Sequence, residues 1–144
     1  MTTIEKSIVI NAPLEKVTAV IDQAERSPEW YAGIDDIEVD PRYPEVGSTN
    51  KMTYKAAGIA FEMTGTVLQH ERLKRKSKLG GMITGTHVYE LTPMGETTRV
   101  KLTTDYEMPG GGLGKIVDRL VVERTNDKNI EQSLANLKVL VESE

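Results

Sequence analysis

The most constraining feature of this sequence is one change in the spacing of its apolar residues. From about residue 34 to residue 107, apolar and polar side chains alternate in short segments separated by turn-forming residues, which is typical of β-strands. After the glycine-rich segment 109–112 the apolar residues recur every three to four positions, and no proline or glycine interrupts residues 115–144. The sequence therefore predicts a run of strands followed by one long helix.

The predicted strands are joined by short connections. Turn signals at Ala57-Gly58, Gly80-Gly81 and Pro93-Met94-Gly95 leave no room for crossover helices, so successive strands form hairpins and the sheet is antiparallel. An alternating segment near the N-terminus adds a further strand. We expect the seven strands at residues 3–11, 35–40, 48–57, 59–70, 72–79, 83–92 and 97–107.

Two short helices are predicted between the first strand and the second. Pro13 suits the first turn of a helix, where its missing N–H costs nothing, and Asn11 is a candidate cap. Apolar residues at three-to-four spacing within 17–21 supply an amphipathic face. A second helical turn is expected to begin at residues 27–29 and to carry the Trp-Tyr pair that follows.

These elements predict a single α+β domain over residues 1–144, a size typical of one domain. The expected architecture is a helix-grip fold: a seven-stranded curved antiparallel sheet with two short helices and a long C-terminal helix. A helix over residues 113–142 would be about 45 Å long at a rise of about 1.5 Å per residue. That length exceeds what a flat sheet needs and suits a helix held lengthwise by a strongly curved sheet.

The composition excludes several kinds of chemistry. The chain has no cysteine, which rules out disulfides, zinc ribbons and thiol catalysis. Because it also has only two histidines, we expect no transition-metal site. The segment Gly110–Lys115 has the glycines of a phosphate-binding loop, but its spacing is wrong and Ile116 stands where Ser or Thr would hold magnesium. We therefore expect no cofactor.

Charge and hydropathy limit the partners and the location. The net charge of −4 gives no general attraction to nucleic acid. The basic run His70–Lys78 is interpreted as a solvated strand face, because alternation sends its lysines to one outer side. No segment approaches the roughly 20 apolar residues that cross a bilayer, and no signal peptide is visible. We expect a cytoplasmic protein without stable membrane insertion, either a monomer or a homodimer.

One helix cannot fill the inner surface of a seven-stranded sheet unless bulky side chains help. The chain has one Phe and one Trp, and aromatic residues make up only 5%, so we expect a ligand cavity between the sheet and the last helix. Strand alternation predicts which side chains face inward, and the alternative is that they are ordinary core residues. The expected ligand-contacting residues are Trp30, Tyr54, Phe61, Met63, His87, Tyr89, Tyr106, Val117 and Leu120.

Two polar features have two interpretations each. His87 either orients a ligand or moves a proton near neutral pH, or it simply hydrogen-bonds a tyrosine hydroxyl or a backbone carbonyl. No carboxylate partner can be read from the spacing, so no catalytic residue is assigned. The stretch 123–129 contains no large apolar residue. It either places polar groups over a pocket or is a solvated stretch with an Arg124–Asp127 pair.

Several short blocks resemble one known superfamily. The most specific is Ile8-x-Ile10-x-Ala12-Pro13-x-x-x-Val17, followed by Asp22 and Glu29-Trp30. Further blocks are Val46-Gly47, Tyr89-x-Leu91-x-Pro93, Thr98-Arg99-Val100, the glycine-rich entry to the last helix, and Ser133-Leu134-x-x-Leu137-Lys138. With the order of elements, they make the chain similar to the SRPBCC superfamily. That group includes birch-pollen-allergen-like proteins, START lipid-transfer domains and the polyketide cyclase/dehydrase family.

The resemblance implies a pocket for a lipid, an isoprenoid, a polyketide or a similar apolar molecule, but it does not imply a reaction. Our leading hypothesis is the binding or transport of a hydrophobic small molecule. The alternative is a polyketide cyclase, aromatase or dehydratase that uses the same pocket, with His87 or a pocket tyrosine as acid or base. Whether the chain is an enzyme stays open. A third hypothesis, an interaction module, predicts a small, filled interior.

Overall fold

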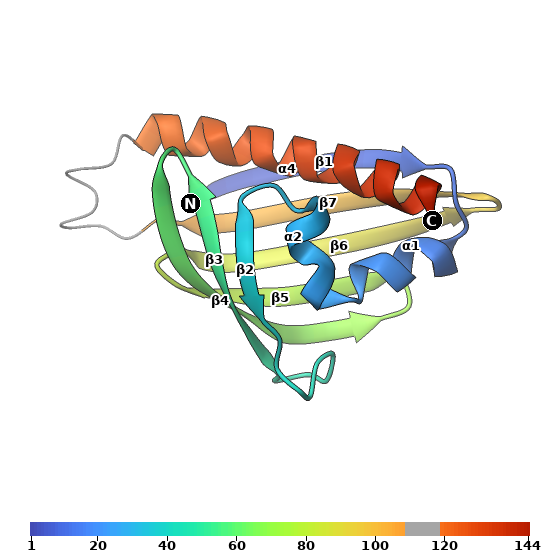
Figure 1. Ribbon diagram of the computed structural model, residues 1–144, viewed down its shortest axis with the longest axis horizontal. Helices are drawn as coiled ribbons and strands as arrows, with labels where there is room; N and C mark the ends of the chain where they lie inside the picture. The colour runs from blue at the N-terminus through green and yellow to red at the C-terminus, as the bar shows by residue number, and fades with distance from the viewer. Residues whose placement is uncertain (109–118) are drawn as a thin grey trace.

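The computed structural model describes residues 1–108 and 119–144. Its elements follow the predicted order of one strand, short helices, six strands and a long helix (Figure 1). Residues 113–118 of the predicted C-terminal helix lie outside the described residues. The elements are β1 (Thr2–Ile10), α1 (Leu14–Ile21), the 3₁₀ turn η1 (Ala24–Arg26), α2 (Ser27–Trp30), β2 (Ile34–Glu38), β3 (Thr49–Ala56), β4 (Ile59–Glu71), β5 (Lys74–Gly81), β6 (Thr84–Met94), β7 (Thr97–Glu107) and α4 (Arg119–Ser143).

All seven strands belong to one antiparallel sheet in the order β1-β7-β6-β5-β4-β3-β2. Each strand from β2 to β6 pairs with the next strand along the chain, as short hairpin connections require. β1 then completes the sheet by pairing with β7, where Ile8 lies opposite Val100. The predicted seven-stranded antiparallel sheet is therefore confirmed.

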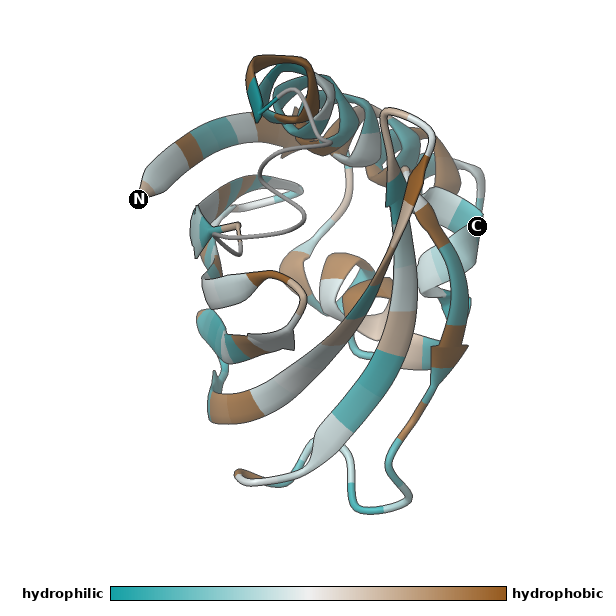
Figure 2. Cartoon of the chain, turned by 90° about the vertical axis from the view of Figure 1, so that its left-hand side faces the viewer, coloured by the Kyte–Doolittle hydropathy of each residue, from teal (hydrophilic) through white to brown (hydrophobic). Residues whose placement is uncertain are grey.

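The sheet curls strongly, and α4 closes the open side of the curl. Figure 2 shows strands on both sides of the interior with α4 running between them. α4 contacts β1 near one edge of the sheet and β3 near the other. The α+β helix-grip architecture expected from the length of the last helix is confirmed.

α4 turns one buried stripe toward the sheet. Asn126 stands in this stripe where an apolar residue would otherwise be expected, which explains the break in the pattern over 123–129. Neither α4 nor any other helix in the described ranges is apolar enough over a sufficient length to span a membrane. The buried positions of α4 are Val122, Asn126, Ile130, Ser133, Leu134, Leu137 and Val141.

The structure corrects the position of one turn. The chain reverses at Met82-Ile83 between β5 and β6, and not at Gly80-Gly81, because both glycines belong to β5. A Cβ on Gly81 would lie 2.6 Å from the carbonyl oxygen of Glu62. Glycine is therefore needed here for the close approach of two strands.

The structure also corrects the predicted cap of α1. The residue before the helix is Pro13, in an extended conformation, and it makes no side-chain capping hydrogen bond. Asn11 lies two residues before this position, too early to cap the helix. Its backbone N–H instead donates to Oε2 of Glu142 at 2.9 Å, which ties the end of β1 to the end of α4.

Candidate functional site

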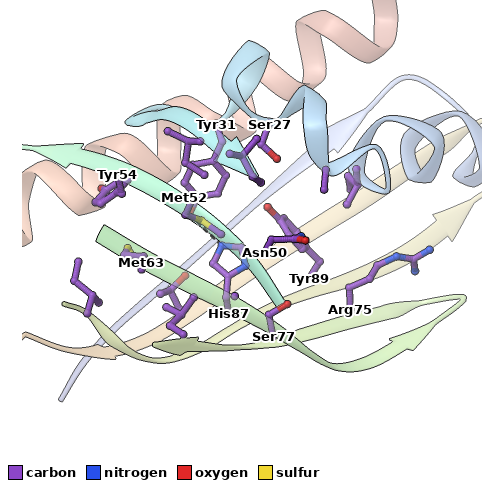
Figure 3. Close-up of a pocket in the computed structure, with 18 of the residues that line it drawn as sticks. Ser27, Tyr31, Asn50, Met52, Tyr54, Met63, Arg75, Ser77, His87 and Tyr89 are labelled. Carbon is purple, nitrogen blue, oxygen red and sulfur yellow. Dashed lines mark hydrogen bonds between the residues drawn. The ribbon is translucent and has the colours of Figure 1, made fainter. Parts of the chain in front are cut away.

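A cavity of about 170 Å³ lies inside the curl, between the sheet, the short helices and α4 (Figure 3). Inner-face side chains of β2 to β7 line it, together with residues of the segment from α1 to α2 and of α4. Most of the lining is apolar, with Met52, Met63, Leu79 and Ile130 among its members. A space inside the curl is therefore present, as the shortage of bulky side chains predicts.

Six of the nine expected ligand-contacting residues line this cavity. Strand alternation accounts for five of them, because side chains two positions apart along β3, β4, β6 and β7 share the inner face of the sheet. The sixth, Trp30, ends α2 and is buried. The six residues are Trp30, Tyr54, Met63, His87, Tyr89 and Tyr106.

Two other expected residues, Phe61 and Leu120, do not lie at the cavity wall. Phe61 is only 1% exposed and packs in the core beside Tyr54, with 6.4 Å between ring centroids. Leu120 is 54% exposed, which corrects the expectation for it. Two residues along a helix correspond to about 200° of rotation, so Leu120 faces away when Val122 faces the sheet. Val117 lies outside the described residues.

Sequence reasoning missed several polar residues of the wall. Arg75 and Ser77 line the cavity from β5, although the run that contains them reads as a solvated basic face. The same alternation that sends Lys74, Lys76 and Lys78 outward sends these two residues inward, so the signal was present in the sequence. The remaining polar lining residues outside the expected ligand-contacting set are Ser27, Tyr31, Tyr43, Asn50, Thr104 and Asn126.

An aromatic group forms one wall of the cavity. The hydroxyl of Tyr31 and Nε2 of His87 are hydrogen-bonded at 3.0 Å. The His87 ring meets the Tyr89 ring edge-on, with 4.9 Å between the ring centroids. The ring centroid of Trp30 lies 5.6 Å from that of Tyr31 and 6.4 Å from that of Tyr89. His87 therefore has a tyrosine hydroxyl as its partner, which is the structural interpretation of this residue.

Burial keeps this aromatic group uncharged. Burial lowers the pKa of His87 to about 4, so the imidazole is neutral at pH 7. Burial likewise raises the pKa of Tyr31 and of Tyr89 well above the usual value for a phenol. The group can exchange hydrogen bonds with a ligand but carries no charge near neutral pH.

The backbone that carries Trp30 and Tyr31 is fixed by α4. Ser133 Oγ accepts the backbone N–H of Ala32 at 2.8 Å. Nδ2 of Asn136 donates to the carbonyl oxygen of Trp30 at 3.1 Å. These bonds satisfy backbone groups at the end of a very short helix and set the position of the two aromatic rings.

A second polar group joins the sheet to α4. The hydroxyl of Tyr54 donates to Oδ1 of Asn126 at 2.7 Å, and Nδ2 of Asn126 donates to the hydroxyl of Tyr106 at 2.9 Å. Nδ2 of Asn129 also donates to the Tyr54 hydroxyl, at 3.0 Å. Burial raises the pKa of Tyr54 to about 12, so its phenol stays protonated. Every member of this group already has a protein partner.

The same residues decide between the two interpretations of the stretch 123–129. Asn126 is 5% exposed and lines the cavity, so the stretch does bring a polar group to the interior. The alternative, a solvated stretch with an Arg124–Asp127 pair, is wrong in this respect. Asp127 instead pairs with Lys6 of β1, with 3.1 Å between Nζ and Oδ2.

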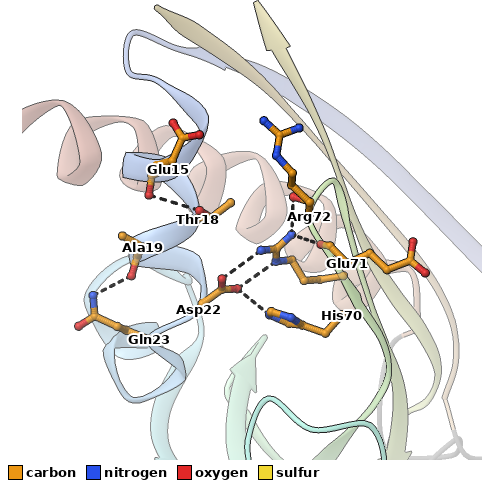
Figure 4. A network of polar contacts seen from close by, with 9 residues as sticks. Glu15, Thr18, Ala19, Asp22, Gln23, His70, Glu71 and Arg72 are labelled. Carbon is orange, nitrogen blue, oxygen red and sulfur yellow. Dashed lines mark hydrogen bonds and ion pairs between the residues drawn. The ribbon is translucent and has the colours of Figure 1, made fainter.

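Arg75 is the one charged residue among the described lining residues, and its charge is balanced. Its Nε and Nη2 donate to the two carboxylate oxygens of Asp22, each at 3.0 Å. Its Nη1 donates to the carbonyl oxygens of Glu71 and Arg72. Nε2 of His70 lies 3.2 Å from the same carboxylate (Figure 4). This network joins the residue after α1 to the β4–β5 hairpin.

Two buried polar atoms have no hydrogen-bond partner among the described residues: Nε1 of Trp30 and Oγ1 of Thr104. Both residues line the cavity. Within residues 1–108 and 119–144, no three His, Cys, Asp or Glu side chains come together in a group that could hold a metal ion. Apart from the charge-balanced guanidinium of Arg75, the polar groups of the site are neutral hydroxyl, amide, indole and imidazole groups.

Solved structures share this architecture over nearly the whole chain. The protein TTHA0849 from Thermus thermophilus is 20% identical, with 99% of this chain and 98% of that chain covered and a TM-score of 0.83. The Zhui aromatase/cyclase from Streptomyces sp. R1128 is 13% identical, with coverage of 98% and 93% and a TM-score of 0.83. A START superfamily protein from Mycobacterium smegmatis is 16% identical, with coverage of 98% and 97% and a TM-score of 0.76. At these identities the likeness shows a common fold.

Sequence comparison points to the same group. None of the curated proteins matches the sequence. A family model described as "Polyketide cyclase / dehydrase and lipid transport" matches residues 1–142. This match and the structural neighbours confirm the resemblance drawn from the sequence blocks. The chain therefore belongs to the polyketide cyclase/dehydrase and lipid transport family.

Proposed function

We propose that this protein binds and carries a small hydrophobic molecule in the cavity between the sheet and α4. The observation that carries the proposal is the cavity itself, about 170 Å³ of space with a mostly apolar wall in a chain of only 144 residues. Protein interiors are normally packed without voids larger than a few water molecules, because empty space forfeits van der Waals contacts. A space of this size is better explained by an occupant than by poor packing.

The size of the cavity limits the occupant. Drug-sized ligands occupy pockets of roughly 300–1,000 Å³, whereas an apolar cavity of about 150 Å³ accommodates benzene. A space of about 170 Å³ lies near the lower of these values. We therefore propose a ligand whose buried part is a ring system of about one or two rings.

Trp30 gives a direct test, because it is the only tryptophan of the chain and it lines the cavity. Titration with an aromatic hydrocarbon such as naphthalene should change the Trp30 emission and saturate at one equivalent. The variant Val67→Phe, which adds volume at a lining position, should abolish the change. Leu68→Phe is the matched control, because the adjacent side chain points outward and is 43% exposed. Equal responses of the two variants would count against the proposal.

An enzyme that uses the same cavity is the second candidate, and the Tyr31–His87 hydrogen bond favours it. An aromatase or cyclase activity would need a group that moves protons at the working pH. A histidine with a pKa of about 4 is mostly in its basic form at pH 7 but is a weak base. This candidate predicts that a linear poly-β-ketone is cyclised, and that His87→Ala abolishes the turnover while binding survives. Absence of any cyclised product would exclude it.

A further inference from the structure

We infer that the ligand of this cavity is uncharged and carries a hydrogen-bonding oxygen, as a phenol, an alcohol or a ketone does. The inference rests on the proposed binding function and adds a ligand class to it. It follows from two properties of the described wall. The wall offers no unbalanced charge to an ionised ligand, and it contains polar groups that a pure hydrocarbon would leave without partners.

The first property excludes ionised ligands. Arg75 is the only charged residue of the described lining, and the two oxygens of Asp22 take its Nε and Nη2 donors. Two backbone carbonyls take the donors of its Nη1. A carboxylate entering the cavity would lose its hydration without gaining a free counter-charge, and it would come near the carboxylate of Asp22.

His87 does not supply the missing positive charge. Its Nε2 is already hydrogen-bonded to the hydroxyl of Tyr31. Burial lowers the pKa of its imidazole to about 4, so the ring is neutral at pH 7. The polar part of this wall therefore recognises hydrogen-bonding groups and gives an anion no electrostatic advantage.

The second property disfavours pure hydrocarbons. Ser77 and Tyr89 both line the cavity, and their hydroxyls make no hydrogen bond to any residue that the structure describes. Ser77 lies opposite His87 in the β5–β6 pairing, and Tyr89 is two positions further on the same face. We call Ser77, His87 and Tyr89 the polar patch; Figure 3 shows its three side chains among those around the cavity.

Asn50 adds a donor from β3. It is 6% exposed and lines the cavity. Its Oδ1 accepts the backbone N–H of Asp40 at 2.8 Å, which fixes the orientation of the amide. Its Nδ2 has no hydrogen-bond partner among the described residues. A hydrocarbon would exclude water from such groups without replacing the lost hydrogen bonds, and that penalty selects against it.

The other polar group of the wall is not available in this way. Tyr54, Tyr106 and Asn126 are already bonded to one another, so a ligand gains no new hydrogen bond by approaching them. The ligand oxygen is therefore assigned to the polar patch and Asn50, together with Nε1 of Trp30 and Oγ1 of Thr104, the lining atoms that also lack a partner among the described residues. The apolar body of the ligand is assigned to the wall around Met52 and Met63.

Three matched compounds test the inference: naphthalene, 2-naphthol and 2-naphthoate, titrated separately into the wild-type protein at pH 7 by calorimetry. One net hydrogen bond should make 2-naphthol bind about three- to tenfold more tightly than naphthalene. Uncompensated desolvation should make 2-naphthoate bind at least about tenfold more weakly than 2-naphthol. If either 2-naphthoate or naphthalene binds as tightly as 2-naphthol, the inference about the ligand class is wrong while the proposed binding function stands. If none of the three binds, the proposed function itself fails.

Two variants test the assignment of the oxygen to the polar patch. Tyr89→Phe and Ser77→Ala remove hydroxyls that make no hydrogen bond in the described structure, so both should fold with a Tm close to that of the wild type. At least one should bring the ratio of 2-naphthol to naphthalene affinity close to one. Thr103→Val removes a hydroxyl from the outer side of β7, away from the lining, and should keep the wild-type ratio. If both cavity variants keep the wild-type ratio of 2-naphthol affinity to naphthalene affinity, the assignment of the oxygen to the polar patch is wrong.

Discussion

The hydroxyl of Tyr54 on β3 donates a hydrogen bond of 2.7 Å to Oδ1 of Asn126 on α4. Because Asn126 also donates to Tyr106 on β7, one amide joins the helix to two strands on opposite sides of the curl. This amide replaces an apolar residue in the buried stripe of α4. It thereby fixes the register of the helix over the cavity as well as the orientation of two lining tyrosines.

Replacing Asn126 by alanine should destabilise the fold. The variant leaves the buried Tyr106 hydroxyl without its donor and Tyr54 with only its bond to Asn129, so we expect a loss of about 2–3 kcal/mol in the free energy of unfolding. Equilibrium unfolding in urea measures it. Gln132→Ala, on the exposed face of the same helix, should change the value by less than about 0.5 kcal/mol. Equal effects of the two substitutions would contradict the role given to Asn126.

The charge balance at Arg75 can be altered by a substitution of its ion-pair partner, Asp22. Asp22→Asn removes the negative charge that faces the guanidinium but keeps an acceptor, so the lining gains an uncompensated positive charge. The affinity for 2-naphthoate should rise by about tenfold, while that for 2-naphthol should hardly change. Asp36→Asn, an exposed change on β2, is the control. An unchanged 2-naphthoate affinity in Asp22→Asn would show that Arg75 does not set the charge preference.

His87, half-buried at the cavity wall, should make stability depend on pH because desolvation lowers its pKa. Its folded-state pKa of about 4 lies below the ordinary histidine value of 6.5, so the unfolded chain binds the proton more tightly. Its contribution to stability is therefore complete above pH 6.5 and is lost as the pH falls from there through 4. Between pH 7 and pH 5 the wild type should lose about 2 kcal/mol more than His87→Gln. Parallel pH profiles of the free energy of unfolding in the two proteins would contradict a desolvated, neutral imidazole at this position.

The close contact between β6 and β7 at Gly85 predicts a severe effect of alanine. Gly85 has a φ of +146°, and a Cβ there would lie 1.9 Å from the carbonyl oxygen of Asp105. Gly85→Ala should destabilise by more than about 3 kcal/mol. Gly95→Ala, at a positive φ but with open space around the Cβ, should cost only about 1 kcal/mol. Thermal unfolding of both variants checks the difference, and similar Tm values would show that the strands can separate at Gly85.

The fold could be read from the sequence because its signal is local. Strict alternation in segments such as 97–107 determines both the strand and its inward face, and the glycine- and proline-containing connections determine the pairing. The predicted segment 72–79 is displaced from β5 by two residues, because the chain turns at Arg72-Leu73. A charged residue can stand in a turn or in a strand, so composition alone does not separate the two.

The polar part of the site could be predicted only in part, because it depends on contacts between distant segments. Nothing local distinguishes a buried Asn126 from a solvated one, since its partners are 72 and 20 residues away. Arg75 was hidden in a run of outward lysines, and its role depends on Asp22, 53 residues earlier. For Leu120 the prediction was wrong in the opposite direction: its apolar side chain suggests burial, but its position on α4 faces outward.

Contacts between a bound ligand and the cavity wall test the central claim most directly. In an NMR sample containing 2-naphthol, nuclear Overhauser effects should connect the ligand protons with the methyl groups of Met52 and Met63, which line the cavity. Val67→Phe should remove these signals and Leu68→Phe should retain them. Cross-peaks confined to exposed methyl groups such as that of Met94, with none to the two cavity methionines, would contradict an internal binding site.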